Sequence, residues 1–481
     1  MRRVVIGLEV HVQVSTETKL FCSCPVDYIG ARPNSNVCPT CLGLPGALPV
    51  PNRAAVESAY LTALALNCQV NLRTRFHRKN YFYPDLPKGY QISQYDLPIG
   101  VNGWIDLESG RRVRIQRLHL EEDAGKLVHG ASDGRLGGSS YSLVDYNRSG
   151  VPLMEIVSMP DICSPGDARE YVTRLRRLVR YLGVSDGDME DGSLRVDANV
   201  SLAEEGAPLG TKVEIKNLNS LRALERALEY EVLRQGEALD RGERILQETR
   251  HWDDVQGVTL GSRGKEEAHD YRYFPDPDLP PVEVSERTVE RISRSMPELP
   301  WAKEARFAGD YGIGGDDLQV LLERRDVAEY FQTAVERGCR PRSAATWVRM
   351  ELIPNMDPRE GMGSIHVLPE DLALLDMKVI KGELSPGAVK LILKRMLDDR
   401  CGVEDAIRLC GISGRISGED LARLVDRVLQ ENASVVEEIR SGMDKKGAKE
   451  RFLQGQVMRL AKGQADPAQV GSLIKERLTG E

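Results

Sequence analysis

The sequence predicts an α+β protein in which a mixed α/β region is followed by a region made of helices alone. Residues 1 to about 292 combine short alternating strands, a few helices and many Gly, Pro and Asn turns. From about residue 293 onward the pattern is helical throughout. Between the two, residues 274–281 (FPDPDLPP) can form neither a helix nor a central strand, because each proline fixes φ and lacks an N–H donor. A domain boundary is therefore expected near residues 281–297.

Three strands of the first region alternate cleanly enough for their faces to be assigned. In the first, aliphatic side chains at every second position from Val4 to Val14 share one face, which places Glu9 and His11 on the other. A second strand (193–200) and a third (212–216) repeat this alternation. Each strand is expected to bury its aliphatic face and to present hydrogen-bonding and charged groups on the opposite one.

Two helices of the first region have clear start signals. Ser164 suits an N-cap with Pro165 at the first helical position, and Gly183 follows the end of the apolar stripe. The second helix begins after Ser220 and carries leucines at helical spacing. Both helices are expected to back the sheet.

The helical half has a break near residues 400–417, which predicts two parts, 293–408 and 409–481. The stretch from about Val435 to Leu478 is the most basic part of the molecule and has few acids to balance its charge. Its basic residues are Arg440, Lys445, Lys446, Lys449, Arg451, Arg459, Lys462, Lys475 and Arg477.

Length and composition narrow the possible functions. A chain of 481 residues is expected to hold roughly two to four domains, since single cores rarely exceed about 250 to 300 residues. The formal net charge of −8 argues against a protein that coats nucleic acid non-specifically. The amino terminus lacks the apolar run of a signal peptide, and no stretch approaches the roughly 20 apolar residues of a membrane span. A cytosolic protein without membrane contact is expected.

Four cysteines near the amino terminus form the most specific motif of the sequence. Cys22 and Cys24 are followed, after a loop, by Cys38 and Cys41. Two tight pairs of thiolates at this spacing are typical of tetrahedral zinc, and four protein ligands leave no open coordination position, so such a site would be structural. Unligated cysteines or a redox pair are the alternative. The remaining cysteines have the spacing of ordinary thiols.

Acidic and imidazole groups suggest a second metal site. Glu9 and His11 share the polar face of the first strand, and the segment Glu121-Glu122-Asp123 is predicted to be an acidic turn after the strand-like RLHL. Carboxylates and an imidazole can hold Mg²⁺ when a phosphate supplies further oxygens. Most such pairs are nevertheless solvated, and most such turns begin helices.

Two further segments combine charged, aromatic and amide side chains. Residues 78–85 (RKNYFYPD), with Lys88 and Tyr90 close behind, could clamp a nucleotide through a cation and an aromatic face, or could form a surface hairpin. The strand that presents Arg195 and Asp197 could grip a metal and an α-amino acid, or form cross-strand pairs. The sequence contains no Walker loop, Rossmann glycine fingerprint or serine-hydrolase motif, so an ATP enzyme would need an unusual binding cradle.

Several segments along the chain form a recognisable series. They are, in order, IGLEVHV (6–12), NYFYP (80–84), QISQ (91–94), LHLEEDAGK (118–126), EDGSLR (190–195), KNLNS (216–220), DYRYFP (270–275) and KGQADP (462–467). Together they resemble the GatB/GatE family, in particular the B subunit of the heterotrimeric glutamyl-tRNA(Gln)/aspartyl-tRNA(Asn) amidotransferase, over essentially the whole chain. The archaeal E subunit resembles the same region but has a large extra domain, for which this chain has no room.

The resemblance implies a cradle-shaped catalytic domain (1–292, with a zinc element at 22–41), a helical domain (293–408) and a small helical tail that contacts tRNA (409–481). It also implies partners and a reaction. An amidase A subunit, assembled with a small C subunit, would release ammonia from glutamine or asparagine. The B subunit would phosphorylate the side-chain carboxylate of Glu-tRNA(Gln) or Asp-tRNA(Asn) with ATP and Mg²⁺, and ammonia would displace the phosphate.

Carried over by position, the resemblance also implies roles for individual residues. His11 and Glu122 are the first choices as magnesium ligands, followed by Glu9 and Glu155. The side chains bordering the nucleotide or the aminoacyl end, and those lining the same cavity, would be Lys79, Tyr81, Lys88 and Tyr90, and Arg195 and Asp197. The four cysteines match a zinc element that many members of the family carry.

A non-catalytic, zinc-stapled subunit that binds RNA or supports assembly is the rival hypothesis from a different class of protein. The isolated motifs are compatible with it. The preference between Glu-tRNA(Gln) and Asp-tRNA(Asn) stays open, because both substrates undergo the same chemistry. No amidase nucleophile motif is present, so amide synthesis would depend on ammonia from a partner.

Overall fold

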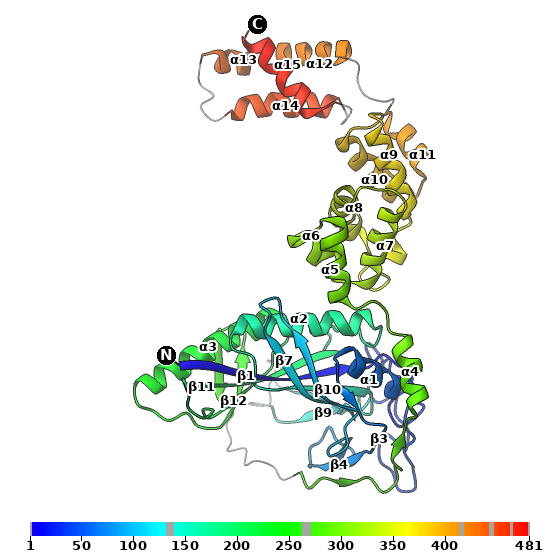
Figure 1. Cartoon of the computed structure of the whole chain (residues 1–481), viewed down its shortest axis with the longest axis vertical. Helices are drawn as coiled ribbons and strands as arrows, with labels where there is room; N and C mark the ends of the chain where they lie inside the picture. The colour runs from blue at the N-terminus through cyan, green and yellow to red at the C-terminus, as the bar shows by residue number, and fades with distance from the viewer. Residues whose placement is uncertain are drawn as a thin grey trace. The chain divides into compact units, whose positions relative to one another are not determined.

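The computed structural model describes residues 2–130, 139–261, 271–412, 418–441, 447–461 and 465–479. The chain divides into two compact units, Met1–Pro300 and Trp301–Glu481 (Figure 1). The first combines sheets and helices and the second is helical, which confirms the predicted α+β class. The predicted division of the helical half at 408/409 stays a prediction. Some residues singled out above lie outside the described ones, namely Asp270, Lys445, Lys446 and Lys462–Gln464.

A large, strongly twisted sheet forms the centre of the first unit. Among the described residues it has nine strands in the order β14-β13-β12-β11-β1-β10-β7-β6-β2. Neighbouring strands are antiparallel except β12 and β13, which are parallel. The strands are β1 (Arg2–Gln13), β2 (Gln69–Val70), β6 (Gly100–Asp106), β7 (Arg112–Glu122), β10 (Pro152–Ser158), β11 (Leu194–Glu204), β12 (Val213–Lys216), β13 (Thr249–Asp253) and β14 (Val258–Gly261).

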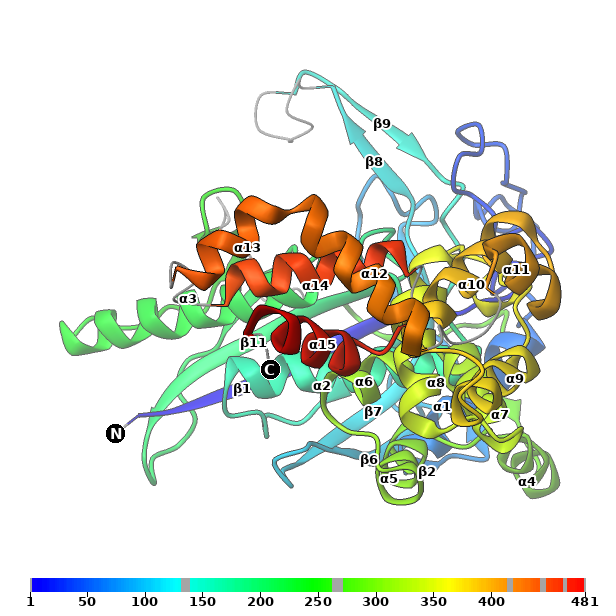
Figure 2. The same cartoon turned by 90° about the horizontal axis from the view of Figure 1, so that it is seen from above.

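Short sheets and helices complete the first unit. One small sheet joins β15 (Phe274–Pro275), β4 (His77–Asn80) and β5 (Tyr90–Ser93), and another joins β16 (Val282–Glu283) to β3 (Arg73–Thr74). The hairpin of β8 (Lys126–His129) and β9 (Ser142–Asp145) reaches away from the large sheet (Figure 2). The helices are α1 (Arg53–Ala65), α2 (Pro165–Tyr181), α3 (Leu221–Asp240) and α4 (Glu286–Arg294).

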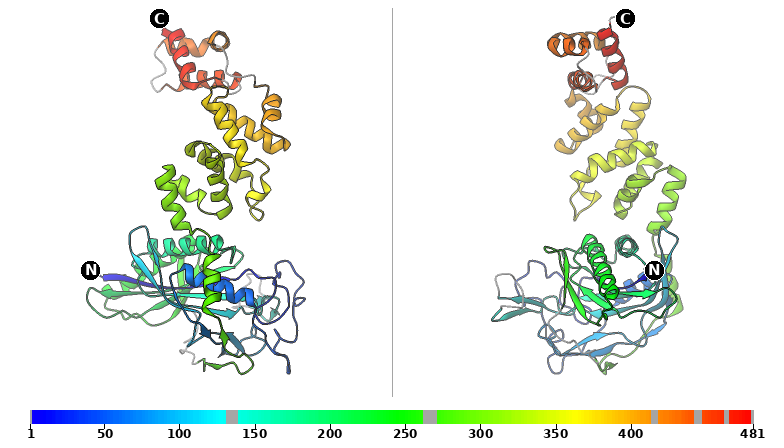
Figure 3. Two further views of the ribbon diagram at one scale, coloured as in Figure 1. Left: turned by 45° about the vertical axis from the view of Figure 1, so that its right-hand side comes forward. Right: turned by 90° about the vertical axis from the view of Figure 1, so that its left-hand side faces the viewer.

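The aliphatic face of the sheet is buried beneath α2 and α3, which lie side by side on it (Figure 3). On β1, Ile6, Leu8, Val10 and Val12 are almost completely excluded from solvent, as the alternation predicts. Each such side chain contributes about 1.5 to 3 kcal/mol of hydrophobic stabilisation. The predicted N-caps are confirmed, because Ser164 and Ser220 accept hydrogen bonds from the backbone N–H groups of the third residues that follow them. We call the face beneath α2 and α3 the closed face. The opposite face, which carries the polar side chains of β1, is called the open face.

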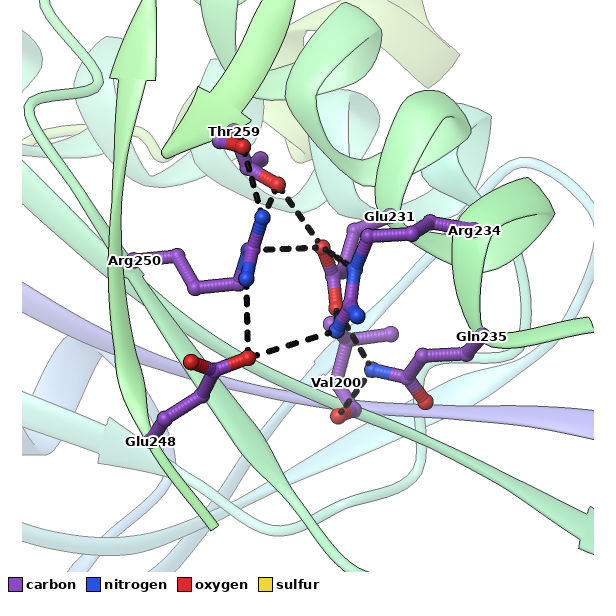
Figure 4. Close-up of polar contacts among 7 residues, drawn as sticks. All are labelled: Val200, Glu231, Arg234, Gln235, Glu248, Arg250 and Thr259. Carbon is purple, nitrogen blue, oxygen red and sulfur yellow. Dashed lines mark hydrogen bonds and ion pairs between the residues drawn. The ribbon is translucent and has the colours of Figure 1, made fainter. Parts of the chain in front are cut away.

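A buried ionic network fastens the edge of the sheet to α3 (Figure 4). The carboxylate of Glu231 accepts hydrogen bonds from Arg234 (2.6 Å), Gln235 (2.9 Å) and the hydroxyl of Thr259 (2.9 Å). Arg250 of β13 lies 3.6 Å from the same carboxylate and donates to Thr259 of β14. The hairpin of β13 and β14 is thereby held against the helix.

The predicted acidic turn at residues 121–123 is wrong. Glu121 and Glu122 are the last two residues of β7, and Asp123 follows them directly. Carboxylates are rarely found in a buried strand unless they are paired, but here histidine and lysine partners compensate their charge. Successive residues of a strand point to opposite faces, so the two glutamates enter different surroundings.

The predicted boundary at 292/293 stays a prediction, and the first compact unit runs to Pro300. Its last helix, α4, packs against α1, and Arg291 donates a hydrogen bond to Glu57 of α1 at 2.8 Å. This contact, distant in sequence, keeps α4 with the sheet region, although the helical pattern of the second half begins nearby.

Helices make up the second unit. Its last part has a core of its own, in which aliphatic side chains of α12, α14 and α15 pack together, among them Val425, Val457 and Ile474. No helix in the part of the chain that the structure describes has the length and apolar character needed to cross a membrane. The α-helices are α5 (Pro300–Tyr311), α6 (Gly315–Leu321), α7 (Arg325–Glu336), α8 (Pro341–Trp347), α9 (Pro369–Ile380), α10 (Pro386–Asp399), α11 (Val403–Cys410), α12 (Gly418–Glu431), α13 (Ala433–Arg440), α14 (Ala448–Leu460) and α15 (Pro467–Thr479), and irregular helical turns occupy Val348–Leu352, Ile353–Asn355 and Met362–Ser364.

Candidate functional site

A row of polar side chains crosses the strands β11, β1, β10 and β7 on the open face of the large sheet. His11 of β1 lies opposite Arg195 of β11 on one side and Glu155 of β10 on the other. Glu155 in turn lies opposite His119 of β7. Directly opposed residues on neighbouring strands share a face, so the strand register alone brings these four groups together.

Three of the side chains on this face form a compact group of possible metal ligands. Ligand atoms of His11, Glu121 and Glu155 all lie within 4.8 Å of one another. Nε2 of His11 is 3.7 Å from Glu155 Oε2 and 3.9 Å from Glu121 Oε1. Both carboxylates are buried, and His119 Nε2 approaches Glu155 Oε2 to 3.2 Å. We call His11, Glu121 and Glu155 the carboxylate–histidine cluster.

The carboxylates of this cluster stay ionised despite their burial. Burial opposes ionisation of Glu155, but His119 and His11 outweigh it and hold the pKa of Glu155 well below its ordinary value. Burial acts on Glu121 in the same way, and His119 keeps the pKa of Glu121 below its usual range. For His11, burial favours the neutral ring, yet Glu155 and Glu121 raise its pKa to about 9. The two carboxylates are thus paired with positively charged imidazole rings, and a bound cation would replace this pairing after His11 releases its proton.

The composition of the cluster suits a hard divalent cation. Mg²⁺ is bound in proteins by one or two carboxylates, with water and phosphate oxygens filling the remaining positions. The structure brings together His11 and Glu155, as the sequence analysis expects, but it places Glu121 beside them instead of Glu122. Sequence reasoning missed Glu121 and His119 as members of one face. The signal was present, because His119 and Glu121 are separated by one residue and so share a face of β7.

A second row of acidic side chains runs beside the cluster. Glu9 of β1 lies opposite Asp197 of β11, and the side-chain amide of Asn199 donates a hydrogen bond to Glu9 at 3.2 Å. Burial raises the pKa of Glu9, and the nearby charge of Glu155 adds to this. Burial likewise raises the pKa of Asp197, although Lys216 opposes the shift. These two carboxyls hold their protons more readily than those of the cluster.

Arg195, which is partly exposed, forms an ion pair with the buried Asp123 at one end of the cluster. Its Nη2 atom donates to Asp123 Oδ2 at 2.8 Å, and Gln13 donates to the same oxygen at 2.8 Å. Burial favours the neutral acid, but Arg195 and Arg148 hold the pKa of Asp123 below its usual range. The guanidinium is thus fixed on the open face, next to His11 in the register.

Lys79 and a group of tyrosines lie at the edge of this region. Lys79 Nζ is 5.0 Å from the ring centre of Tyr271 and 6.0 Å from that of Tyr81. Burial opposes the charge of Lys79, but Glu121 is the largest of the influences that raise its pKa. Tyr273 stacks on Tyr95, with ring centres 4.4 Å apart and planes 11° apart. Sequence reasoning assigned no role to Tyr271 and Tyr273, which reach this place because β15 pairs with β4.

Lys88 and Tyr90 line a different space, together with Glu122. Lys88 Nζ donates to Glu122 Oε2 at 2.6 Å, and the N–H of Ile92 donates to the other carboxylate oxygen at 2.8 Å. The ammonium of Lys88 also lies 5.5 Å from the ring centre of Tyr90. These side chains line a cavity of about 190 Å³, which Cys22 and Cys41 also line. Both carboxylate oxygens of Glu122 therefore already accept hydrogen bonds, one from Lys88 and one from the backbone N–H of Ile92.

The four cysteines that the sequence analysis assigns to a zinc site lie close together. Sulfur atoms of Cys22, Cys24, Cys38 and Cys41 all lie within 4.8 Å of one another. Tetrahedral zinc with bonds of about 2.3 Å would place its sulfur ligands roughly 3.8 Å apart, so small movements would accommodate the ion. A hydrogen bond from the thiol of Cys22 lowers the pKa of Cys41 to about 4. The group can hold zinc.

Comparisons with known proteins agree over nearly the whole chain. The family model described as the GatB/GatE catalytic domain matches residues 4–290, and the one described as the GatB domain matches residues 329–478. Three similar proteins are each named as the B subunit of an aspartyl/glutamyl-tRNA(Asn/Gln) amidotransferase. The protein of Moorella thermoacetica is 48% identical over 98% of this chain and 99% of its own length. That of Carboxydothermus hydrogenoformans is 46% identical over 98% of each chain, and that of Thermotoga maritima 45% identical over 100% of this chain and 99% of its own.

Proposed function

Because this chain belongs to the GatB/GatE family, we propose that it is the B subunit of a tRNA-dependent amidotransferase and carries the carboxylate-activating site. An oxygen of the side-chain carboxylate of Glu-tRNA(Gln) or Asp-tRNA(Asn) attacks the γ-phosphorus of ATP, and ADP leaves. Ammonia then forms a C–N bond at the acyl carbon while phosphate leaves. A carboxylate oxygen is a poor leaving group, and phosphorylation replaces it with a good one.

The observation that supports this proposal best is the carboxylate–histidine cluster on the open face of the sheet. Phosphoryl transfer between two anions needs positive charge between them. We assign His11, Glu121 and Glu155 as the residues that would hold Mg²⁺. When bound, the ion would offset the charge on the phosphates and on the attacking carboxylate. Ser93 donates to Glu121 at 3.1 Å and, with the adjacent His119, would orient this set of ligands.

Side chains around the cluster suit the two substrates. Arg195, held in place by Asp123, would bind an anionic group of the substrate. Asp197 and Glu9 would face the amino group of the substrate or a second cation. Lys79, with Tyr81, Tyr271 and Tyr273, offers a cation among aromatic faces and would border the nucleotide or the aminoacyl end. Lys88, Tyr90 and Glu122 would contact a substrate from the cavity that they line together with Cys22 and Cys41.

The four cysteines would hold a structural zinc ion. Four sulfur atoms from two short segments converge on one point, and such a site leaves no position for a substrate. The element also carries part of the wall of the cavity that Lys88 lines. We expect purified protein to contain one equivalent of zinc. Protein that folds and works without zinc, with four titratable thiols here, would contradict this assignment.

The other subunits and the tRNA tail complete the proposal. Ammonia would come from glutamine or asparagine through an amidase A subunit, joined by a small C subunit. The last helices, α12 to α15, would contact tRNA through their basic residues. A chain ending at residue 410 should then lose tRNA affinity in a salt-dependent manner while keeping its ATP chemistry. Undiminished affinity would contradict the assignment of the tail.

The experiment that tests the catalytic proposal is reconstitution of the complex with the wild-type chain or its His11→Ala variant. The variant should lose ATP-dependent phosphorylation of Glu-tRNA while its binding of tRNA changes little. A variant with full activity would instead support the rival hypothesis of a non-catalytic RNA-binding or assembly subunit. Equal loss of activity and of tRNA binding would indicate misfolding, which circular dichroism of the purified chain detects.

A further inference from the structure

A lysine lies buried against the four cysteines. Lys19 is only 1% exposed, and its Nζ atom lies 3.7 Å from Cys41 Sγ and 3.3 Å from the carbonyl oxygen of Tyr146. The stem of Lys19 runs past Gly150, where an added Cβ would come within 3.4 Å of it and within 3.6 Å of Cys41. The backbone N–H of Lys19 also donates to the carbonyl of Cys24 at 2.9 Å. Both the backbone and the side chain of Lys19 therefore contact the cysteine element.

The position of Lys19 requires a negative partner. Transfer of an ammonium group from water into a protein interior costs several kcal/mol unless an opposite charge lies close. Among the described residues, the ammonium of Lys19 forms no ion pair with a carboxylate, and its contacts are a sulfur atom and a carbonyl oxygen. A carbonyl oxygen carries only a partial charge. Glu122 lines the same cavity but is already paired with Lys88. The group that can supply a full negative charge in direct contact with Lys19 is the sulfur of Cys41, one of the four cysteines that lie together.

We propose that Lys19 supplies the counter-charge of a zinc–thiolate cluster formed by the four cysteines. This inference depends on the zinc site proposed above. A zinc ion bound by four thiolates carries two net negative charges, which are costly to bury without compensation. Lys19 offsets one of them from a fixed position, and the N–H of Cys38, 3.1 Å from Cys41 Sγ, adds a second donor. Groups of this kind around the ligands of a metal typically change its affinity by about 10- to 100-fold.

A purely structural role for Lys19 is the competing explanation. In that case its ammonium would only tie the cysteine element to the loop that carries Tyr146, through the 3.3 Å hydrogen bond to the carbonyl. Such a tie would stabilise the fold whether or not metal is bound. The two explanations differ in one respect, since only a counter-charge changes the affinity for zinc according to the charge at position 19.

The test compares zinc affinities of full-length chains by competition with a chromogenic chelator. Lys19→Met should bind zinc about 10- to 100-fold more weakly than wild type, and Lys19→Arg, which keeps the charge, should retain most of the affinity. Lys303→Met removes another buried lysine, far along the chain in α5, and should leave zinc affinity unchanged. Unchanged affinity in Lys19→Met would overturn the proposal, as would equal losses in the Met and Arg variants.

A measurement on the wild-type chain covers the case in which Lys19→Met does not fold. Lysines are acetylated with limiting reagent before and after removal of zinc, and the products are read by mass spectrometry. Lys19 should be protected in the zinc-bound chain and become reactive without zinc, while Lys303 stays unchanged. Equal reactivity of Lys19 in both states would refute the counter-charge. A wild-type chain that binds no zinc at all would refute the zinc site itself and this inference with it.

Discussion

The two faces of the large sheet both bury glutamates, but they satisfy them in different ways. On the helix-covered face, Glu231 is fully buried and its two carboxylate oxygens accept hydrogen bonds from Arg234, Gln235 and Thr259. On the open face, Glu155 and Glu121 are also buried, but they face imidazoles at distances between 3.2 and 3.9 Å.

This difference separates a structural carboxylate from one that is available for chemistry. A guanidinium stays charged and holds a carboxylate in a fixed, fork-shaped arrangement. An imidazole can lose its proton and become a metal ligand itself, so the carboxylates beside it keep lone pairs that a cation could use. We therefore expect substitutions on the closed face to change stability, and those on the open face to change activity.

The largest expected effect belongs to the closed face. Glu231→Ala leaves Arg234 and Arg250 near a vacated, buried position and should lower the free energy of unfolding by about 3 to 5 kcal/mol. Urea unfolding followed by circular dichroism measures this loss. Glu229→Ala, an exposed residue on the same helix, is the control and should stay within about 0.5 kcal/mol of wild type. A similarly small change for Glu231→Ala would show that the network contributes little.

On the open face, adjacent glutamates should differ in their effect on catalysis. Glu121→Gln should lower the rate of glutamine-dependent amidation of Glu-tRNA by about 10²- to 10³-fold, since it removes charge from the proposed magnesium site. Glu122→Gln, which alters the pair with Lys88, should have a smaller effect. Both are measured in the reconstituted complex over a range of Mg²⁺ concentrations. The reverse order of the two effects would return the metal-ligand role to Glu122.

A milder substitution tests one hydrogen-bonding group of the network on the closed face. Thr259→Val keeps the shape of the side chain but removes the hydroxyl between Glu231 and Arg250. The expected loss is about 1 to 3 kcal/mol of unfolding free energy, below that of Glu231→Ala, with kcat unchanged. Urea unfolding and the amidation assay test the two parts. A loss of activity without loss of stability would remove the proposed separation of the two faces.

The smallest expected effect is a gain in stability on the open face. Burial raises the pKa of Asp197, so the folded state binds its proton more readily than the unfolded state. Stability then falls as pH rises between the unfolded and the folded pKa, and this loss persists at higher pH. Asp197→Asn removes the loss and should raise the Tm by about 2 °C at pH 8, with no gain at pH 3. Thermal melts at the two pH values test this, and a lower Tm at pH 8 would contradict it.

Local sequence patterns predicted much of the fold correctly. Strict alternation from Val4 to Val14 assigned the faces of β1, and Ser164 and Ser220 marked the starts of α2 and α3. These features depend on residues only a few positions apart, whose geometry follows from backbone periodicity and capping. The four cysteines also converge as their spacing predicts.

Contacts between distant segments account for what the sequence reasoning missed. The resemblance favours Glu122, but Glu121 lies with His11 and Glu155, because it shares a face of β7 with His119 and β7 pairs with β10. Tyr271 and Tyr273 reach Lys79 because β15 pairs with β4, almost two hundred residues earlier in the chain.

The sequence by itself determined which side chains are available on the polar face of each strand, where the helices begin, and which cysteines can meet. Only the tertiary structure decided which strands are neighbours and in which register, and therefore that His11 meets Glu155 and Glu121, and that Lys19 lies against Cys41. The physical reason is the distance along the sequence over which each kind of interaction acts. Periodicity and capping act within a few residues, whereas charge compensation in a buried site depends on which distant segments the packing of the whole sheet brings together.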